Sequence, residues 1–197
     1  VGSIEVEPSH VDHSVPGAYA FIVHTSEGAV IYTGDFRMHG GRADLTVDFV
    51  EAAAKTKPTA MICEGTNLTE AEVSTEQEVQ NKISKVVAST PKLVLADFRP
   101  ADVDRIRTFF QAAKENGRRL AISLKQAYVL ERLKADKNLE LPDVSSDDFL
   151  IFQREKKRYS PWEKSITGRY SNVVDAQRVG EVQSKVILSA SYSDFNE

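Results

Sequence analysis

The sequence predicts an α/β fold, in which a β-rich segment is followed by a three-layer unit of a parallel sheet with helices on its faces. Near the start of the chain, two β-branched and aromatic runs lie on either side of a short turn. From residue 59 onwards, short apolar runs alternate with segments of helical length. Such alternation is typical of parallel sheets whose strands are connected by helices.

A β-hairpin is expected in the β-rich segment. Residues 18–25 (AYAFIVHT) and 29–34 (AVIYTG) form its two strands, and Gly28 can supply the positive φ that the turn needs. Pairing about this turn brings Asp35 back towards the segment that contains His13. The two side chains are therefore expected at the same end of the sheet.

The remaining elements follow in chain order. The predicted strands are 59–64 (TAMICE), 92–97 (KLVLAD), 119–124 (RLAISL), 149–152 (FLIF) and 185–191 (KVILSAS). The predicted helices are 44–55, a helix opened by a capping box of Ser74 and Gln77, a helix from Pro100 to Gly117, 126–135, and a polar helix near 172–181.

Composition and charge exclude several classes of protein. Hydrophobic residues make up 41% and charged residues 27%, and no apolar run reaches the roughly 18 residues of a membrane span. The net charge of −4 means that nucleic-acid binding must come from local patches. Cys63 is the single cysteine, which excludes an internal disulfide framework and fits the reducing cytoplasm. No strand is followed by a Gly-x-Gly-x-x-Gly motif, so dinucleotide binding is not expected.

All four histidines lie within the first forty residues. Imidazole and carboxylate groups are common zinc ligands, so His13 and Asp35 could each supply one. The alternative is that His13 is a structural loop residue and that Asp35 caps a turn. His24 is expected to be an exposed strand residue, and His10 and His39 could support a site or be incidental.

The run DHSVPGAYAFIVHTSEGAVIYTGDFR resembles the third and fourth metal-binding motifs of metallo-β-lactamase-fold nucleases. It is most similar to the RNase J-like members of the β-CASP group. The resemblance implies that His13 binds zinc and that Asp35 bridges two zinc ions. The stretch ICEGTN (62–67) resembles the β-CASP acidic motif, with Glu64 as the matching residue.

The segment VLADFRPADVDRIRTFFQAAKENGRRLAISLK is similar to the strand–helix–strand that opens the β-CASP region of this family. The resemblance thus implies part of a metallo-β-lactamase-fold domain at 1–60, built on the hairpin and its sheet. It implies a β-CASP-type three-layer parallel α/β domain at 61–197, incomplete at its C-terminus.

The family's His-x-His-x-Asp-His signature is missing, because Pro8 stands where its first histidine would be, and no histidine follows His39. We therefore expect a fragment of a longer enzyme with an incomplete zinc site. The enzyme implied by the resemblance is a cytoplasmic ribonuclease, exo- or endonucleolytic, in which a metal-bound water hydrolyses RNA. Asp35 and Glu64 are the catalytic candidates. A DNA nuclease or other phosphodiesterase of the same fold, and a non-catalytic nucleic-acid-binding module, remain alternatives.

Basic and aromatic residues are interleaved between 154 and 164, a pattern that favours contacts with RNA phosphates and bases. A solvated linker is the alternative. Strand ends and helix starts add further candidates, because open α/β sheets bind ligands there. The candidate nucleic-acid-binding residues are Arg99, Arg105, Lys125, Lys156, Lys157, Arg158, Trp162, Ser189 and Ser191. A sheet edge left exposed would also permit a homo-oligomer.

Overall fold

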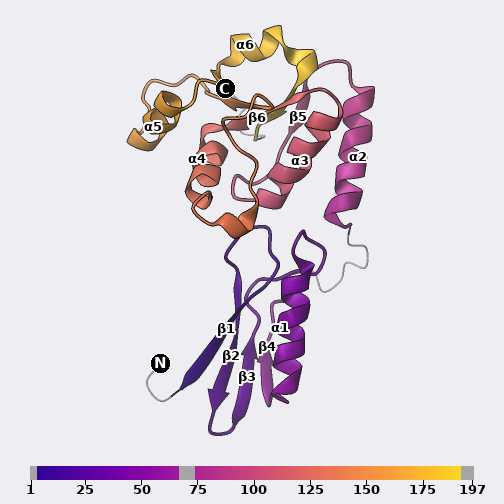
Figure 1. Cartoon of the computed structure of the whole chain (residues 1–197), viewed down its shortest axis with the longest axis vertical. Coiled ribbons are helices and arrows are strands. Elements are labelled where there is room, and N and C mark those ends of the chain that lie inside the picture. The colour runs from indigo at the N-terminus through magenta and orange to yellow at the C-terminus, as the bar shows by residue number, and fades with distance from the viewer. Residues whose placement is uncertain (1–3, 67–73, 192–197) are drawn as a thin grey trace. The chain divides into compact units, whose positions relative to one another are not determined.

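The computed structural model of the chain describes residues 4–66 and 74–191. The chain divides into two compact units, Val1–Glu76 and Gln77–Glu197 (Figure 1). The boundary predicted at 60/61 falls inside the first unit, because the strand that follows it pairs with a strand of the hairpin. The predicted α/β class, with a parallel sheet flanked by helices, is confirmed.

In residues 4–66, the first unit forms a four-stranded sheet with one helix. Its strands, in the spatial order β1-β2-β3-β4, are β1 (Glu5–His10), β2 (Tyr19–Thr25), β3 (Gly28–Tyr32) and β4 (Ala60–Ile62). The predicted hairpin is confirmed as β2 and β3, which pair antiparallel, whereas β4 runs parallel to β3. Helix α1 (Ala43–Lys55) packs Phe49 and Ala53 against Ile22 and Ile31 of the hairpin.

The second unit is a five-stranded, entirely parallel sheet in the order β5-β9-β6-β7-β8. Its strands are β5 (Val94–Ala96), β6 (Arg119–Ser123), β7 (Phe149–Phe152), β8 (Val173–Val174) and β9 (Val186–Ser189). Its helices are α2 (Glu76–Ser89), α3 (Val103–Glu115), α4 (Leu124–Leu133), α5 (Pro161–Arg169) and α6 (Ala176–Glu181), with short 3₁₀ turns at Lys137–Leu139 and Gln183–Lys185.

The structure of the second unit differs from the prediction in two places. The polar helix near 172–181 is instead the short strand β8 followed by α6. Helix α5 was not predicted, although Ser160 and Glu163 form a capping box and Pro161 occupies its first turn. The helix lacks an apolar periodicity, because it lies in a charged stretch and only two of its side chains, Glu163 and Ile166, are buried.

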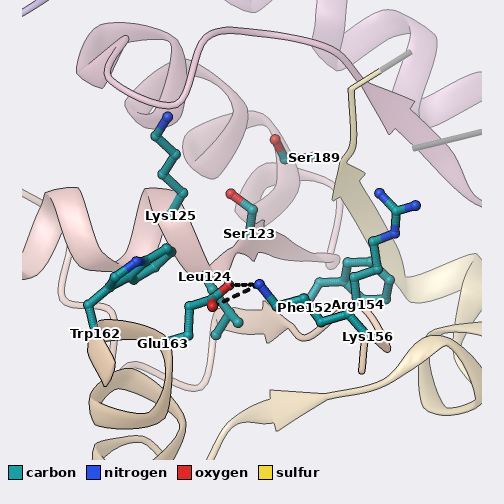
Figure 2. Close-up of a pocket in the computed structure, with 9 residues that line it drawn as sticks. All are labelled: Ser123, Leu124, Lys125, Phe152, Arg154, Lys156, Trp162, Glu163 and Ser189. Carbon is teal, nitrogen blue, oxygen red and sulfur yellow. Dashed lines mark hydrogen bonds and ion pairs between the residues drawn. The ribbon is translucent and has the colours of Figure 1, made fainter. Parts of the chain in front are cut away.

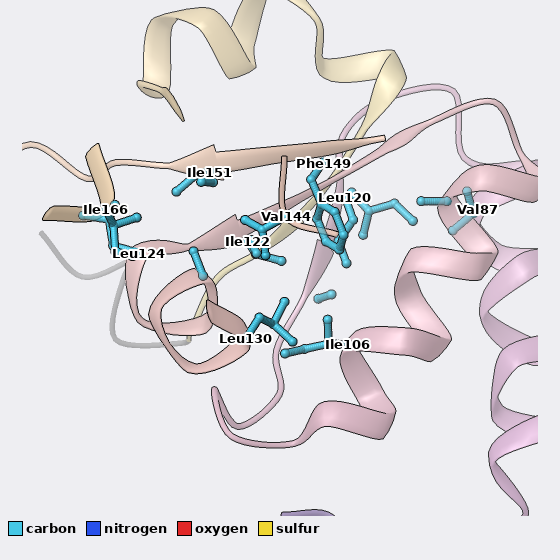
Figure 3. Close-up of a cluster of buried hydrophobic side chains, with 14 residues drawn as sticks. Val87, Ile106, Leu120, Ile122, Leu124, Leu130, Val144, Phe149, Ile151 and Ile166 are labelled. Carbon is cyan, nitrogen blue, oxygen red and sulfur yellow. The ribbon is translucent and has the colours of Figure 1, made fainter. Parts of the chain in front are cut away.

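Separate hydrophobic clusters cover the two faces of the second unit's sheet. Figure 3 shows the larger one, in which Ile106, Leu130 and Ile166 from three helices pack with Ile122 and Phe149 of the strands. On the other face, a smaller cluster joins α6 to β6, β7 and β9. Its members are Ala121, Leu150, Val179, Val186, Leu188 and Ala190. Burial on both faces explains why these strands are continuous apolar runs.

The direction in which successive strands are added across this sheet reverses once. Strands β6, β7 and β8 are added in succession, and α6 then returns the chain so that β9 inserts between β5 and β6. All five strands point the same way, so their carboxyl ends share one edge. Among the helices described, none is both long and apolar enough to cross a membrane.

Candidate functional site

In the first unit, the loops after β1 and β3 and the end of β4 come together. We call His13, Asp35 and Glu64, which these segments carry, the rim. The backbone N–H of Phe36, next to Asp35, donates to Glu64 Oε1 at 3.0 Å. His13 is close enough to Glu64 to affect its ionisation electrostatically. The structure therefore gathers the three predicted residues at one end of the sheet, with Asp35 exposed and the other two half-buried.

Glu64 is held in its ionised form. Hydrogen bonds with Thr66 are the main cause of its lowered pKa, followed by the hydrogen bond from the backbone of Phe36 and, more weakly, by the nearby imidazole of His13. At neutral pH this side chain is a carboxylate, able to accept protons or hydrogen bonds but not to act as an acid.

The backbone before Asp35 turns sharply at Gly34. Its φ is +57°, and an added Cβ would lie 2.7 Å from the carbonyl oxygen of Tyr19. Only glycine fits such a left-handed position with so close a neighbour. This close approach between the first residue of β2 and the end of β3 matches the hairpin pairing that placed Asp35 near His13.

A buried ion pair that the sequence analysis did not identify joins the two loops of the rim. Asp12, which is 2% exposed, accepts from Arg37 Nε at 3.2 Å and from the backbone N–H of Gly40 at 2.8 Å. The backbone of Arg37 also donates to the carbonyl of Asp12 at 2.8 Å, and Thr46 bridges both residues through its hydroxyl. Asp12 precedes His13 and Arg37 follows Asp35 by two positions, so this network fixes the rim's loops against each other.

The other three histidines make different contacts. His24 faces Glu7 at 3.6 Å on the surface of the hairpin, in agreement with an exposed strand residue. The ring of His10 packs on Tyr19 with centroids 4.2 Å apart. His39 accepts a backbone hydrogen bond from Glu76 through its carbonyl oxygen.

The second unit carries two hollows at the shared edge where its parallel strands end. The first hollow has a volume of about 330 Å³ and is lined by Ser123, Leu124, Lys125, Phe152, Arg154, Lys156, Trp162, Glu163 and Ser189 (Figure 2). The second hollow, of about 340 Å³, is lined by Asp97, Phe98, Arg99, Pro100, Ser123, Lys125, Gln126, Ser189 and Ser191. Three residues, Ser123, Lys125 and Ser189, belong to both.

Gln126 ties the ends of two neighbouring strands together beneath the hollows. Its buried amide donates from Nε2 to Ser189 Oγ at 2.8 Å, and its Oε1 accepts from the backbone N–H of Ser123 at 2.8 Å. The latter contact is half of the capping box that starts α4. Gln126 thereby sets the spacing between the hydroxyls of Ser123 and Ser189.

One wall of the first hollow is an internal ion pair. Lys156 Nζ lies 2.6 Å from Glu163 Oε1, and Glu163, 6% exposed, also accepts from the backbone N–H of Ser160 at 2.7 Å. Burial raises the pKa of Glu163, but hydrogen bonds from Lys156 and Ser160 outweigh burial, and the net pKa is lowered. Lys156 thus forms an ion pair with Glu163, whereas Lys125 has no ion-pair partner among the described residues.

Comparison with known proteins gives a consistent group of relatives, although no protein-family model matches the sequence. The chain is 27% identical to Ribonuclease J from Sinorhizobium meliloti, over 79% of this chain and 29% of that protein. It is 24% identical to Ribonuclease J 2 from Streptococcus pyogenes, over 86% of this chain and 30% of that protein. The predicted RNase J-like relationship is confirmed.

The chain spans less than a third of the length of these relatives. A crystal structure of a protein of unknown function from Enterococcus faecalis has the same fold. The two superpose with a TM-score of 0.70 at 19% identity, over all of this chain and 43% of the other.

The structure places most of the predicted nucleic-acid-binding residues in the linings of the two hollows. Lys125, Lys156, Trp162 and Ser189 line the first hollow, and Lys125, Ser189, Arg99 and Ser191 line the second. Arg105, Lys157 and Arg158 line neither. Sequence reasoning missed the roles of Ser123 and Gln126, although the spacing Ser-x-x-Gln before an apolar run was a visible capping signal.

The rim does not form a complete metal site from the described residues of the chain. Within 4–66 and 74–191, no group of three or more histidine, cysteine, aspartate or glutamate side chains is arranged to hold a metal ion. Zinc sites in proteins use three or four protein ligands. His13, Asp35 and Glu64 are therefore, at most, part of a ligand set.

Proposed function

We propose that this chain is the RNA-binding part of an RNase J-like ribonuclease, and that it binds RNA at the strand-end edge of its second unit. One observation carries the proposal. In a chain of net charge −4, Lys125 of α4 and Arg154 and Lys156 of the segment between β7 and α5 converge with Trp162 on one hollow that contains a single carboxylate, Glu163. The name of these relatives, Ribonuclease J, supports RNA as the ligand.

The chemistry of this hollow suits a single-stranded nucleic acid. Cationic side chains neutralise phosphates, and an aromatic ring offers a stacking surface that every base can use. The apolar part of the lining, Leu124, Phe152 and Trp162, is where a base would lose water. Such a site requires unstacked bases, which the interior of a duplex does not present.

We further propose that the ribonuclease is zinc-dependent and that His13 and Asp35 supply two of its ligands. The remaining ligands would have to come from outside the described residues. Bound zinc would lower the pKa of a water molecule and offset charge on a phosphate. Glu64, ionised and hydrogen-bonded beside Asp35, would hold the Asp35 segment in place or accept a proton.

A second candidate function is a nucleic-acid-binding module without catalysis. The observation that favours it is the absence of a three-ligand metal group among the described residues. The two functions share the RNA-binding edge, so they differ only in what the rim does. A DNA nuclease of the same fold is a further alternative.

The first test is RNA binding by the chain, measured by fluorescence anisotropy with a labelled single-stranded oligoribonucleotide. We expect affinity to fall steeply as salt rises, because several phosphates are neutralised. The deoxyribonucleotide of the same sequence is the competitor. Tighter binding of DNA would overturn RNA as the ligand, and no binding of either at low salt would overturn the proposed function.

The second test is zinc calorimetry on the chain and on its His13→Ala and Asp35→Ala variants. We expect weak binding that each substitution weakens further, and no RNA hydrolysis by the chain alone, because too few ligands are present. Robust RNA hydrolysis that survives both substitutions would contradict the assignment of His13 and Asp35.

A further inference from the structure

The two hollows are built alike on either side of a shared centre. Each has one aromatic ring that a second ring supports, since Trp162 packs on Tyr128 at 5.3 Å and Phe98 stacks on Phe109 at 5.0 Å. Each also has one arginine in its lining, Arg154 in the first hollow and Arg99 in the second. Between them lie the residues common to both.

The shared centre offers one cation and two hydroxyls. In Figure 2, Ser123 and Ser189 lie between Trp162 on one side and Arg154 on the other. Lys125 is exposed and unpaired among the described residues, unlike Lys156, whose charge is used by Glu163. Lys125 is therefore the cation best able to meet an anion placed at this centre.

A single nucleic-acid strand repeats the same pattern, with a flat apolar base on each side of a linking phosphate. We propose that the two hollows accept two consecutive nucleotides of single-stranded RNA, with the linking phosphate at Lys125, Ser123 and Ser189. One base lies against Trp162 and the next against Phe98. This inference rests on the proposed function and specifies how its RNA-binding edge reads the strand.

Support of each ring by a second ring favours such a site energetically. A ring already packed against a neighbour loses little conformational freedom when a base contacts it. Likewise, Gln126 holds Ser189 at 2.8 Å and accepts from the backbone of Ser123, so the two hydroxyls are positioned before RNA arrives. The volumes of about 330 and 340 Å³ fall at the lower end of the range for small-ligand sites, which suits one nucleotide each.

Trp162 is the only tryptophan of the chain, so its fluorescence reports on the first hollow alone. The experiment titrates the chain with uridine monophosphate, with the dinucleotide UpU, which has a single linking phosphate, and with an RNA duplex. We expect UpU to quench Trp162 with an affinity about tenfold higher than that of the mononucleotide, because it fills both hollows. We expect the duplex to bind more weakly than UpU.

Three variants locate the contacts. Lys125→Ala should lower the affinity for UpU about tenfold, whereas Lys185→Ala, at an exposed position just before β9 and outside both linings, should leave it within about twofold. Phe98→Leu, which is aimed at the second hollow, should lower the affinity for UpU towards that of the mononucleotide and leave mononucleotide binding unchanged. Circular dichroism checks that each variant is folded.

Equal affinity for UpU and the mononucleotide would overturn the proposal, as would equal effects of the two lysine substitutions or duplex binding as tight as that of UpU. Labelled RNA that binds by anisotropy without any change in Trp162 would also overturn it, while the proposed RNA-binding function would stand. Absence of RNA binding in every assay would overturn both.

Discussion

The rim of the first unit and the strand-end edge of the second unit differ in how well the sequence alone indicates a site there. At the rim, a continuous run of residues resembles a family motif, yet the described side chains do not complete a metal site. At the edge, the individual residues were scattered and weakly patterned. Nevertheless, the fold collects Arg99, Lys125, Trp162 and Ser189 around two adjoining hollows.

The difference follows from how each place is assembled. A parallel sheet brings every strand's carboxyl end to one edge, so residues distant in sequence meet there without a local motif. A metal site instead needs a full set of donors at short distances, and a hairpin can bring together only the few that flank it. Substitutions that destabilise one unit and leave the other unchanged therefore test whether the rim and the strand-end edge are held together independently.

The largest expected effect is on the second unit alone. Arg118 is 8% exposed and donates to the carbonyl oxygens of Lys92 at 2.8 Å, Val87 at 3.2 Å and Thr90. Arg118→Met should cost roughly 4 kcal/mol of unfolding free energy, because three charge-assisted hydrogen bonds are lost. Urea unfolding followed by Trp162 fluorescence measures this unit.

The matched control for Arg118 is Arg178→Met, which removes an exposed arginine from a surface pair with Glu181. It should change stability by less than about 0.5 kcal/mol. Hydrogen exchange of the β2 amides should be unchanged in both variants. Loss of β2 protection in Arg118→Met would show that the units do not unfold separately.

The next effect belongs to the first unit. Asp12→Asn removes one charge from the buried pair with Arg37 and should cost about 3 kcal/mol, because the Arg37 guanidinium loses its hydrogen-bonded carboxylate, which Glu76 Oε1, at 3.9 Å, replaces only in part. Hydrogen exchange of the α1 and β2 amides measures the loss, and Asp48→Asn, at an exposed position of α1, is the control. A shift of the His13 imidazole resonances is expected as well. Unchanged exchange in Asp12→Asn would show that this network does not hold the loops of the rim.

Much of the fold was predictable because burial leaves a pattern in the sequence. The run VILS is buried along its whole length and the run FLIF over its first three residues, so both are recognisable as strands without reference to their neighbours. Helix α5 gave no such signal, since its capping Ser160 and Glu163 lie within a charged stretch. The strand β8 consists of only Val173 and Val174, too short for any periodicity.

In the candidate sites, too, contacts set by local pairing were predictable and contacts set by tertiary packing were not. Proximity of Asp35 to the β1–β2 loop followed from hairpin pairing, which is a local rule. The link between Ser123 and Ser189 of β9 through Gln126 did not, because no local pattern specifies that β9 inserts between β5 and β6. Strand order is decided by tertiary packing, so the hydrogen bond from Gln126 to Ser189 could be found only in the structure.

Gln126→Ala tests that tertiary link and should have a smaller effect than the first two substitutions. Loss of a buried amide that bonds both strand ends should cost about 1.5 kcal/mol by urea unfolding. RNA affinity should also fall, because Ser189 is no longer held. Gln177→Ala, at an exposed position of α6, is the control. Wild-type RNA affinity in Gln126→Ala would mean that the edge does not depend on this spacing.

The smallest effect is a pH dependence of the wall of the first hollow. Folding lowers the pKa of Glu163 from its ordinary value of 4.5, against the opposing effect of burial, because Lys156 and Ser160 bond its ionised form. The resulting stabilisation is fully present above the unfolded pKa and is lost as pH falls through the lowered folded pKa. The Tm of the wild type should therefore drop further between pH 6 and pH 3 than that of Glu163→Gln, by a few degrees.

Glutamine at position 163 keeps the capping geometry, so the comparison isolates the charge. Thermal unfolding monitored at Trp162 gives both Tm curves, and Glu181→Gln, exposed on α6, serves as the control that should follow the wild type. Parallel curves for the wild type and Glu163→Gln would mean that the ion pair with Lys156 adds no net stability. In that case Lys156 would be available to phosphate, and the distinction between it and Lys125 at the edge would fail.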